Sequence, residues 1–213
     1  MLVPPQHTVA VATPAFELTV PMIVIASVVV VSVLAWIIKP LKYAFLMSPY
    51  LVVHRLQLHR MLTAGWLHAD VSHLFFNLFT LYFFGDYVVK ALGPVMFVVL
   101  YVSAVVLAHV PTMIRHRNNP KYSSLGASGA VAAIIFSAIL LYPGIKLSLL
   151  FLPIPIPGVL YGIGYLAYSA YASWRAKDGV NHDAHFAGAI YGCLLTYALE
   201  PTRVMRTVQT FFN

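Results

Sequence analysis

Four polar residues lie within long apolar stretches of this 213-residue sequence: His73, Asn77, Ser128 and His185. A polar side chain inside a membrane helix is costly, and it usually has a function. A serine hydroxyl becomes a good nucleophile when a neighbouring base takes its proton, and histidine, with an ordinary pKa of ~6.5, suits that task. Ser128 and His185 are therefore a candidate catalytic pair.

The other two polar residues could stabilise the oxyanion that nucleophilic attack creates. His73 and Asn77 are spaced i, i+4, so they share one helix face. Ser128 falls in the first turn of its predicted helix, where backbone N–H groups lack partners and the helix dipole is positive. No carboxylate is placed to complete a triad: Asp183 is on nearly the opposite helix side from His185, and Asp70 belongs to a loop. The sequence favours a Ser–His dyad.

The composition determines the class of protein that must position these residues. The chain is 61% hydrophobic and 9% charged, whereas a soluble domain carries about 25% charged residues. This excludes an ordinary soluble globule, and it excludes disorder as well. The net charge of +7 is spread between apolar stretches, which suits lipid headgroups better than nucleic acid. The lone Cys193 allows no intramolecular disulfide, and no cofactor or metal is expected.

The expected fold is all-α, a polytopic membrane protein with six transmembrane helices in one domain, residues 1–213, with a core of about 18–200. The long segment 40–70 is too charged to cross and too apolar to float free, so it is predicted to lie as a loop in the membrane interface. Three alternating prolines before Gly158 predict an extended lead-in to the fifth helix. The predicted spans are 18–38, 71–89, 94–114, 126–142, a helix within 147–174, and 183–199.

The direction of the spans predicts where the polar residues meet. Spans two, four and six cross in the same direction, and His73, Ser128 and His185 each lie near the start of one of them, so they should sit at similar depth. Small residues on spans four and six allow close approach of the two helices. On span six this face consists of Ala184, Gly188 and Gly192. On span four the small residues form two such pairs, Ser128 with Ala132 and Gly129 with Ala133.

The motifs resemble those of rhomboid intramembrane serine proteases. Gly126-Ala127-Ser128-Gly129 is similar to their GxSG motif, residues 73–77 (HLFFN) to their HxxxN motif, and residues 185–188 (HFAG) to their catalytic histidine and following glycine. Residues 58–68 resemble the entry to the second helix, with Arg60 at the family's Trp-Arg arginine. The three motifs occur in order on three spans of the same direction, and the match covers about residues 18–200.

The resemblance implies a six-helix bundle that hydrolyses peptide bonds in membrane-anchored proteins. Ser128 would be the nucleophile and His185 the general base and acid, while His73, Asn77 and the Ser128 N–H would form the oxyanion hole. Gly126, Gly129 and Gly188 would be supporting motif positions. Substrates of the family enter past the fifth helix. The chain departs from the family at two positions: His59 replaces the usual Trp, and Ala132 stands where some members place a Tyr against the catalytic histidine.

The expected setting is a multi-pass protein of a cell membrane, with transmembrane protein substrates and the bilayer as partners. The loops on the active-site side carry nine Lys or Arg and the other side four. The positive-inside rule would place the site in the cytoplasm, whereas bacterial rhomboids open their site to the outer face. The sequence assigns no oligomeric state.

Other function classes also fit some of the residues. A membrane metalloenzyme could use imidazole ligands, although no H-E-x-x-H motif is present. A rhomboid-like protein without protease activity could bind membrane clients, but such proteins usually lack the serine or the histidine. A small transporter is a weaker option because no charged residue lies deep in a span. The candidate metal ligands are His54, His59, His68, His73, His182 and His185.

Overall fold

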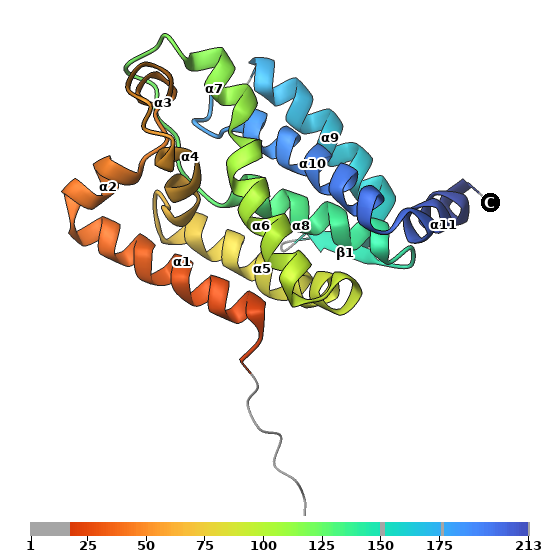
Figure 1. Cartoon of the computed structure of the whole chain (residues 1–213). Coiled ribbons are helices and arrows are strands. Elements are labelled where there is room, and N and C mark those ends of the chain that lie inside the picture. Colours follow the sequence, from red (N-terminus) through yellow and green to blue (C-terminus); the bar gives the residue numbers. More distant parts are fainter. Residues whose placement is uncertain (1–17, 150–151, 176, 213) are drawn as a thin grey trace, which may run out of the picture.

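The structure is a computed structural model that describes residues 18–149, 152–175 and 177–212, and most of these residues are helical (Figure 1). The six longest helices of the predicted segments pack side by side (Figure 1). They are α1 (Val20–Ile37), α5 (Val71–Leu92), α6 (Pro94–Ala108), α8 (Ser128–Leu141), α9 (Gly158–Arg175) and α10 (His182–Leu199).

Two stretches of the described residues are long and apolar enough to cross a membrane on their own: Val20–Ile37, and Pro94–His116, which covers α6 and α7 (Val110–His116). The central helix α8 is as apolar but has 14 residues. Each predicted span thus contains a helix, while length and hydropathy alone mark two of the stretches as membrane spans.

The segment after α1 is folded rather than an open loop. It forms α2 (Lys39–Phe45), α3 (Pro49–Arg55), α4 (His59–Thr63) and the 3-10 turn η1 (Ala64–Trp66). Arg60 holds the segment together, because its buried guanidinium donates to the carbonyl oxygens of Tyr43 and Leu46 at 2.7 and 2.9 Å. His59 contacts the Ala44 carbonyl at 3.3 Å and is exposed. The anchoring of this segment therefore depends on Arg60.

The prediction of an all-α fold is wrong in one detail. Strands β1 (Lys146–Leu149) and β2 (Leu152–Pro157) form a small antiparallel sheet, with Lys146 opposite Pro157. Alternating prolines exclude a helix but permit an edge strand, so the predicted extended segment pairs with β1. Residues 150–151 lie outside the described part of the chain. Helix α9 begins at Gly158, as predicted.

Helix α8 forms the centre of the fold. Twelve of its 14 residues are buried, and α5, α6, α9, α10 and the C-terminal helix α11 (Pro201–Phe212) all contact it. The main buried apolar cluster joins α5, α6 and α8. A helix that is hydrophobic all round belongs in the interior, so Ser128, its first residue, is placed where the surrounding helices converge.

Candidate active site

The structure brings Ser128 and His185 together. The His185 Nε2 and Ser128 Oγ atoms lie 2.7 Å apart, a normal hydrogen-bond distance. Ser128 is the first residue of α8, and His185 is in the first turn of α10. Two residues 57 positions apart thus meet at the N-terminal ends of two neighbouring helices.

Small residues determine how closely these two helices approach. A side-chain carbon at Gly188 would lie 2.6 Å from the carbonyl carbon of Gly129, and closer still to its oxygen. One turn further along, Gly192 meets the backbone of Ala133 in the same way. Real Cβ atoms do not tolerate such contacts. The glycines of α10 therefore allow α8 to approach closely enough for Ser128 and His185 to meet.

Two side-chain caps fix where the helices of the site begin. Asn181 accepts from the Ala184 N–H at 3.1 Å and starts α10, and it also accepts from the Thr112 hydroxyl at 2.8 Å. Asp70 accepts from the His73 N–H at 2.8 Å and starts α5. Capping of this kind satisfies helix N–H groups that otherwise lack partners. Asp70 therefore supports the site, and it is not a partner of His185.

His73 and Asn77 of α5 line the same cavity as Ser128 and His185. The imidazole of His73 lies directly against Gly126: a side-chain carbon there would be 2.9 Å from His73 Nε2 and 3.9 Å from Ser128 Oγ. Gly126 also has φ of +120°, which non-glycine residues rarely adopt. Asn77 is buried, and its amide donates to the His73 carbonyl at 3.1 Å.

The N-terminus of α8 offers backbone donors beside these side chains. Ala127 precedes the helix and its methyl group makes no capping hydrogen bond. The first N–H groups of an α-helix have no partner within the helix, and the helix dipole favours negative charge at this end. The Ser128 N–H, the His73 ring and the Asn77 amide thus surround one cavity with hydrogen-bond donors.

Tyr165 is a site residue that the sequence reasoning did not identify. Its ring stacks on the His185 imidazole, with centroids 6.4 Å apart and planes 19° apart. Tyr165 comes from α9. The motif resemblance instead points to α8, where Ala132 occupies the position at which some rhomboids place a tyrosine. The spacing of four between Tyr161 and Tyr165 puts both rings on one face of α9 and could have indicated an inward-facing aromatic pair.

The acidic residues near His185 have other partners. Asp183 forms an ion pair with Arg115 at 2.9 Å and accepts from the Ser173 hydroxyl. Asp178 contacts His182 Nε2 at 3.0 Å. The Val180 N–H and the His182 ring hold the pKa of Asp178 below its ordinary value. The described residues thus show a Ser–His pair whose histidine is packed by an aromatic ring.

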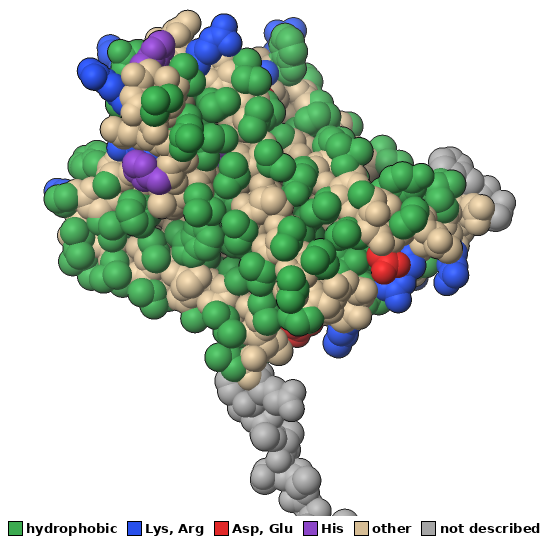
Figure 2. All heavy atoms as spheres, viewed as in Figure 1, with side chains coloured by type: hydrophobic (Ala, Val, Ile, Leu, Met, Phe, Trp, Pro, Cys, Tyr) green, Lys and Arg blue, Asp and Glu red, His purple; other side chains and the backbone are tan. Residues whose placement is uncertain are grey.

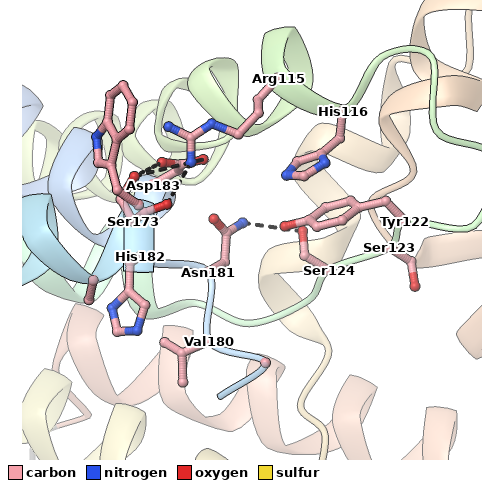
Figure 3. Close-up of a pocket in the computed structure, with 13 residues that line it drawn as sticks. Arg115, His116, Tyr122, Ser123, Ser124, Ser173, Val180, Asn181, His182 and Asp183 are labelled. Carbon is pink, nitrogen blue, oxygen red and sulfur yellow. Dashed lines mark hydrogen bonds and ion pairs between the residues drawn. The ribbon is translucent and has the colours of Figure 1, made fainter. Parts of the chain in front are cut away.

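The dyad opens into a cavity of about 630 Å³. A second cavity of similar volume adjoins it and shares Ser124 and Asn181 with it. Figure 3 shows how Arg115 reaches Asp183 and Ser173 across this second cavity, while Asn181 donates to Ser124 at 3.4 Å. These contacts join α7, α9, α10 and the loop before α8 around the site.

The histidines do not gather into a metal centre in the part of the chain that the structure describes. Within it, no group of three or more His, Cys, Asp or Glu side chains could hold a metal ion. His68 bonds to Ser32 at 3.0 Å, His54 to Asn118 at 3.3 Å, and His185 to Ser128. The imidazoles are thus divided among separate polar contacts.

Comparison with known protein families matches residues 55–202 to the rhomboid domain. This chain belongs to the rhomboid family. The matched region contains Ser128, His185, His73 and Asn77, and the family consists of membrane proteins.

Known relatives carry rhomboid-like names, one of which includes the word inactive. This rhomboid is 30% identical to the RHOMBOID-like protein 12, mitochondrial, of Arabidopsis thaliana over 148 residues, which cover 62% of this chain and 44% of that protein. It is 28% identical to the mouse Presenilin-associated rhomboid-like protein, mitochondrial, over 66% of this chain and 38% of that protein. It is 32% identical to the Inactive RHOMBOID-like protein 8 of Arabidopsis thaliana, over 53% of this chain and 33% of that protein. The chain thus spans less than half the length of these relatives.

Proposed function

We propose that this rhomboid is an intramembrane serine endopeptidase that cleaves membrane-anchored proteins with a Ser128–His185 dyad. The observation that carries the proposal is the 2.7 Å contact between His185 Nε2 and Ser128 Oγ, within a cavity that His73 and Asn77 also line. A nucleophile within hydrogen-bond reach of its base, beside donors for an oxyanion, is the arrangement that acyl transfer requires.

The reaction follows from the placement of these atoms. Ser128 Oγ attacks the scissile carbonyl carbon while its proton passes to His185 Nε2. The resulting oxyanion takes hydrogen bonds from the Ser128 N–H and from His73 and Asn77. Collapse breaks the C–N bond, and His185 gives its proton to the leaving amine. Water then attacks the acyl carbon while its proton passes to His185. The ester bond to Ser128 Oγ breaks, His185 returns the proton to Oγ, and the carboxylic acid product leaves.

The packing of His185 supports a dyad without an acid. In the resting state the Ser128 hydroxyl donates to Nε2, so Nδ1 carries the imidazole proton. The Tyr165 ring stacks against the imidazole and can hold its orientation, a task that a carboxylate performs in a triad. Asp183 is already paired with Arg115.

The proposed architecture is a six-helix transmembrane bundle in one domain, residues 1–213, with its core at about 18–200. Helices α1, α5, α6, α8, α9 and α10 would be the spans. The segment α2 to η1 would lie in the membrane interface, since it combines apolar residues with Arg55 and Arg60. No metal or cofactor takes part in the proposed reaction.

The proposed location is a cell membrane; the word mitochondrial belongs to the relatives' names. Fractionation of cells that produce the tagged chain tests this directly, because enrichment with an internal organelle would contradict it. Protease access to a tag on each end of the chain would show which face holds the site.

The decisive experiment for the activity uses purified protein in detergent and a membrane-anchored test substrate. Wild type should cleave it, and Ser128→Ala should abolish cleavage without changing the melting temperature. Continued cleavage by Ser128→Ala would exclude the serine mechanism. A folded wild type that never cleaves would instead favour a membrane-client binder.

Covalent labelling tests the role of His185 separately. A fluorophosphonate serine probe should attach at Ser128 in wild type and only weakly after His185→Ala, because the hydroxyl then lacks its base. Equal labelling of the two proteins would mean that His185 is not the base.

A further inference from the structure

The C-terminal helix α11 (Pro201–Phe212) differs from the other long helices because its faces have opposite character. Val204 and Val208 are spaced i, i+4 and Met205 lies beside them, whereas Arg203, Arg206 and Thr210 follow at i, i+3 and i+7 on the other side. An amphipathic helix with cations on its polar face is typical of a helix that lies in the membrane interface.

The described buried residues of α11 lie along one edge, which attaches the helix to the rest of the fold. Val204 is buried, and Thr207 is buried with its hydroxyl donating to the Leu140 carbonyl at 2.7 Å. This bond satisfies a carbonyl in the last turn of α8, where intrahelical donors are missing. The helix is thus held in a fixed orientation at the end of the molecule opposite to α3 and α7 (Figure 1).

The outer side of α11 combines apolar and cationic side chains. Met205 is 46% exposed and Val208 is 38% exposed. A shallow groove of about 500 Å³ runs along this side, lined by Pro201, Thr202, Met205, Arg206 and Gln209. It offers a guanidinium, a hydroxyl and an amide as donors next to an apolar side chain, the combination that the junction of a phosphate group and an acyl chain would fill.

Charge complementarity indicates which lipid would occupy the groove. Among the described residues Arg206 has no ion-pair partner, and Arg203 has only the long 3.7 Å contact with Glu200. Lys90, in the last turn of α5, and Lys146, at the start of β1, carry further positive charge at this end, but neither lines the groove. Figure 2 shows Lys and Arg side chains next to hydrophobic ones where α11 lies. A cationic interface of this kind attracts anionic lipids, at about 1 kcal/mol, or fivefold in affinity, per Lys or Arg.

We propose that α11 is an anionic-phospholipid site: its groove holds the phosphate of a headgroup through Arg206, supported by Arg203, while Met205 and Val208 enter the acyl region. The leaflet concerned is the one opposite to the Ser128–His185 end. This site does not depend on the proposed protease activity, since it lies at the other end of the fold.

Native mass spectrometry of the full-length protein, titrated with phosphatidylglycerol or phosphatidylcholine, tests the site. We expect tighter retention of phosphatidylglycerol, and a loss of about thirtyfold in its affinity in Arg203→Gln/Arg206→Gln. The matched control Lys90→Gln/Lys146→Gln removes the same charge from the same end and should weaken binding much less. Serine-probe labelling at Ser128 should be unchanged in both variants.

Three results would overturn the proposal: equal retention of the two lipids, equal losses in the arginine and lysine variants, or displacement of phosphatidylglycerol by inorganic phosphate. The last result would indicate a free-anion site. A second measurement needs no substitution. Hydrogen exchange of the α11 amides should be slower in vesicles of phosphatidylcholine mixed with phosphatidylglycerol than in phosphatidylcholine alone, and equal exchange would contradict lipid binding.

Discussion

Gly188→Ala tests whether the approach of α8 and α10 determines the geometry of the dyad. Gly188 lies one turn after His185 and directly over the backbone of Gly129, the residue after Ser128. The substitution adds a methyl group and leaves every polar group of the site in place. Any loss of activity must therefore come from a change in the distance between the two helices.

The required displacement follows from the structure. The new Cβ would lie 2.6 Å from the Gly129 carbonyl carbon and closer to its oxygen, whereas carbon atoms pack at about 3.5 Å or more, so the helices must separate by at least about 0.9 Å. If the dyad opens equally, the 2.7 Å contact between His185 Nε2 and Ser128 Oγ lengthens to about 3.6 Å or more, outside hydrogen-bond range.

The expected loss of activity and the expected loss of stability can be measured separately. A misplacement of about 1 Å costs on the order of 100-fold in rate, while overpacking costs roughly 1–3 kcal/mol of unfolding free energy. The assay is cleavage of the membrane-anchored substrate together with a melting curve in detergent. The Gly188→Ala protein should fold, melt at a lower temperature than wild type and cleave about 100-fold more slowly.

Gly164→Ala is the matched control. Gly164 lies on α9 with nothing within 4 Å of the added carbon, so the same substitution should leave activity unchanged and stabilise the helix by about 0.5–1 kcal/mol. Full activity in Gly188→Ala would refute the reasoning, because helix separation would then not control the dyad. A similar loss in both variants would do so as well.

Three further predictions concern other residues of the site. Asn77→Ala should lower kcat by about 100-fold with little change in KM; steady-state kinetics would show a change confined to KM if Asn77 only bound substrate. Tyr165→Ala should slow serine-probe labelling at Ser128 while Tyr165→Phe keeps it, because the ring and not its hydroxyl stacks on His185; equal labelling rates in all three proteins would exclude this packing role. Burial lowers the pKa of His68 to about 3, and unfolding restores its ordinary value of ~6.5. Between pH ~6.5 and ~3 the unfolded chain therefore binds one more proton than the folded protein, so the stability that is present above pH ~6.5 is lost on acidification. Melting curves between pH 7 and 4 should therefore decline less steeply in His68→Asn than in wild type, and parallel declines would contradict a neutral buried His68.

The sequence predicted the six long helices because each of them is recorded in a local pattern. Apolar runs interrupted by Lys39-Pro40 or Pro143-Gly144 mark where helices end, since proline and glycine disrupt helical hydrogen bonding. The same rule predicted an extended segment before Gly158. It could not predict that this segment pairs with Lys146–Leu149, because strand pairing depends on contacts between segments.

The sequence also predicted which residues form the candidate site. The direction of successive spans placed His73, Ser128 and His185 at one depth, and the small residues around Gly188 predicted which helices pack closely. These inferences need only helix periodicity and the alternation of span direction. Folding of the segment 40–70 into short helices was not predicted, because the carbonyls that Arg60 binds are brought to it only by the turns before it.

Only the tertiary structure decided what surrounds the dyad. Tyr165 reaches His185 from α9, and Arg115 reaches Asp183 from α7; no spacing along the chain links either pair. Attachment of α11 through Thr207 to the end of α8 is a contact of the same kind. Local sequence sets backbone conformation and the faces of each helix, whereas the partner of each face depends on how all the helices fill one interior together.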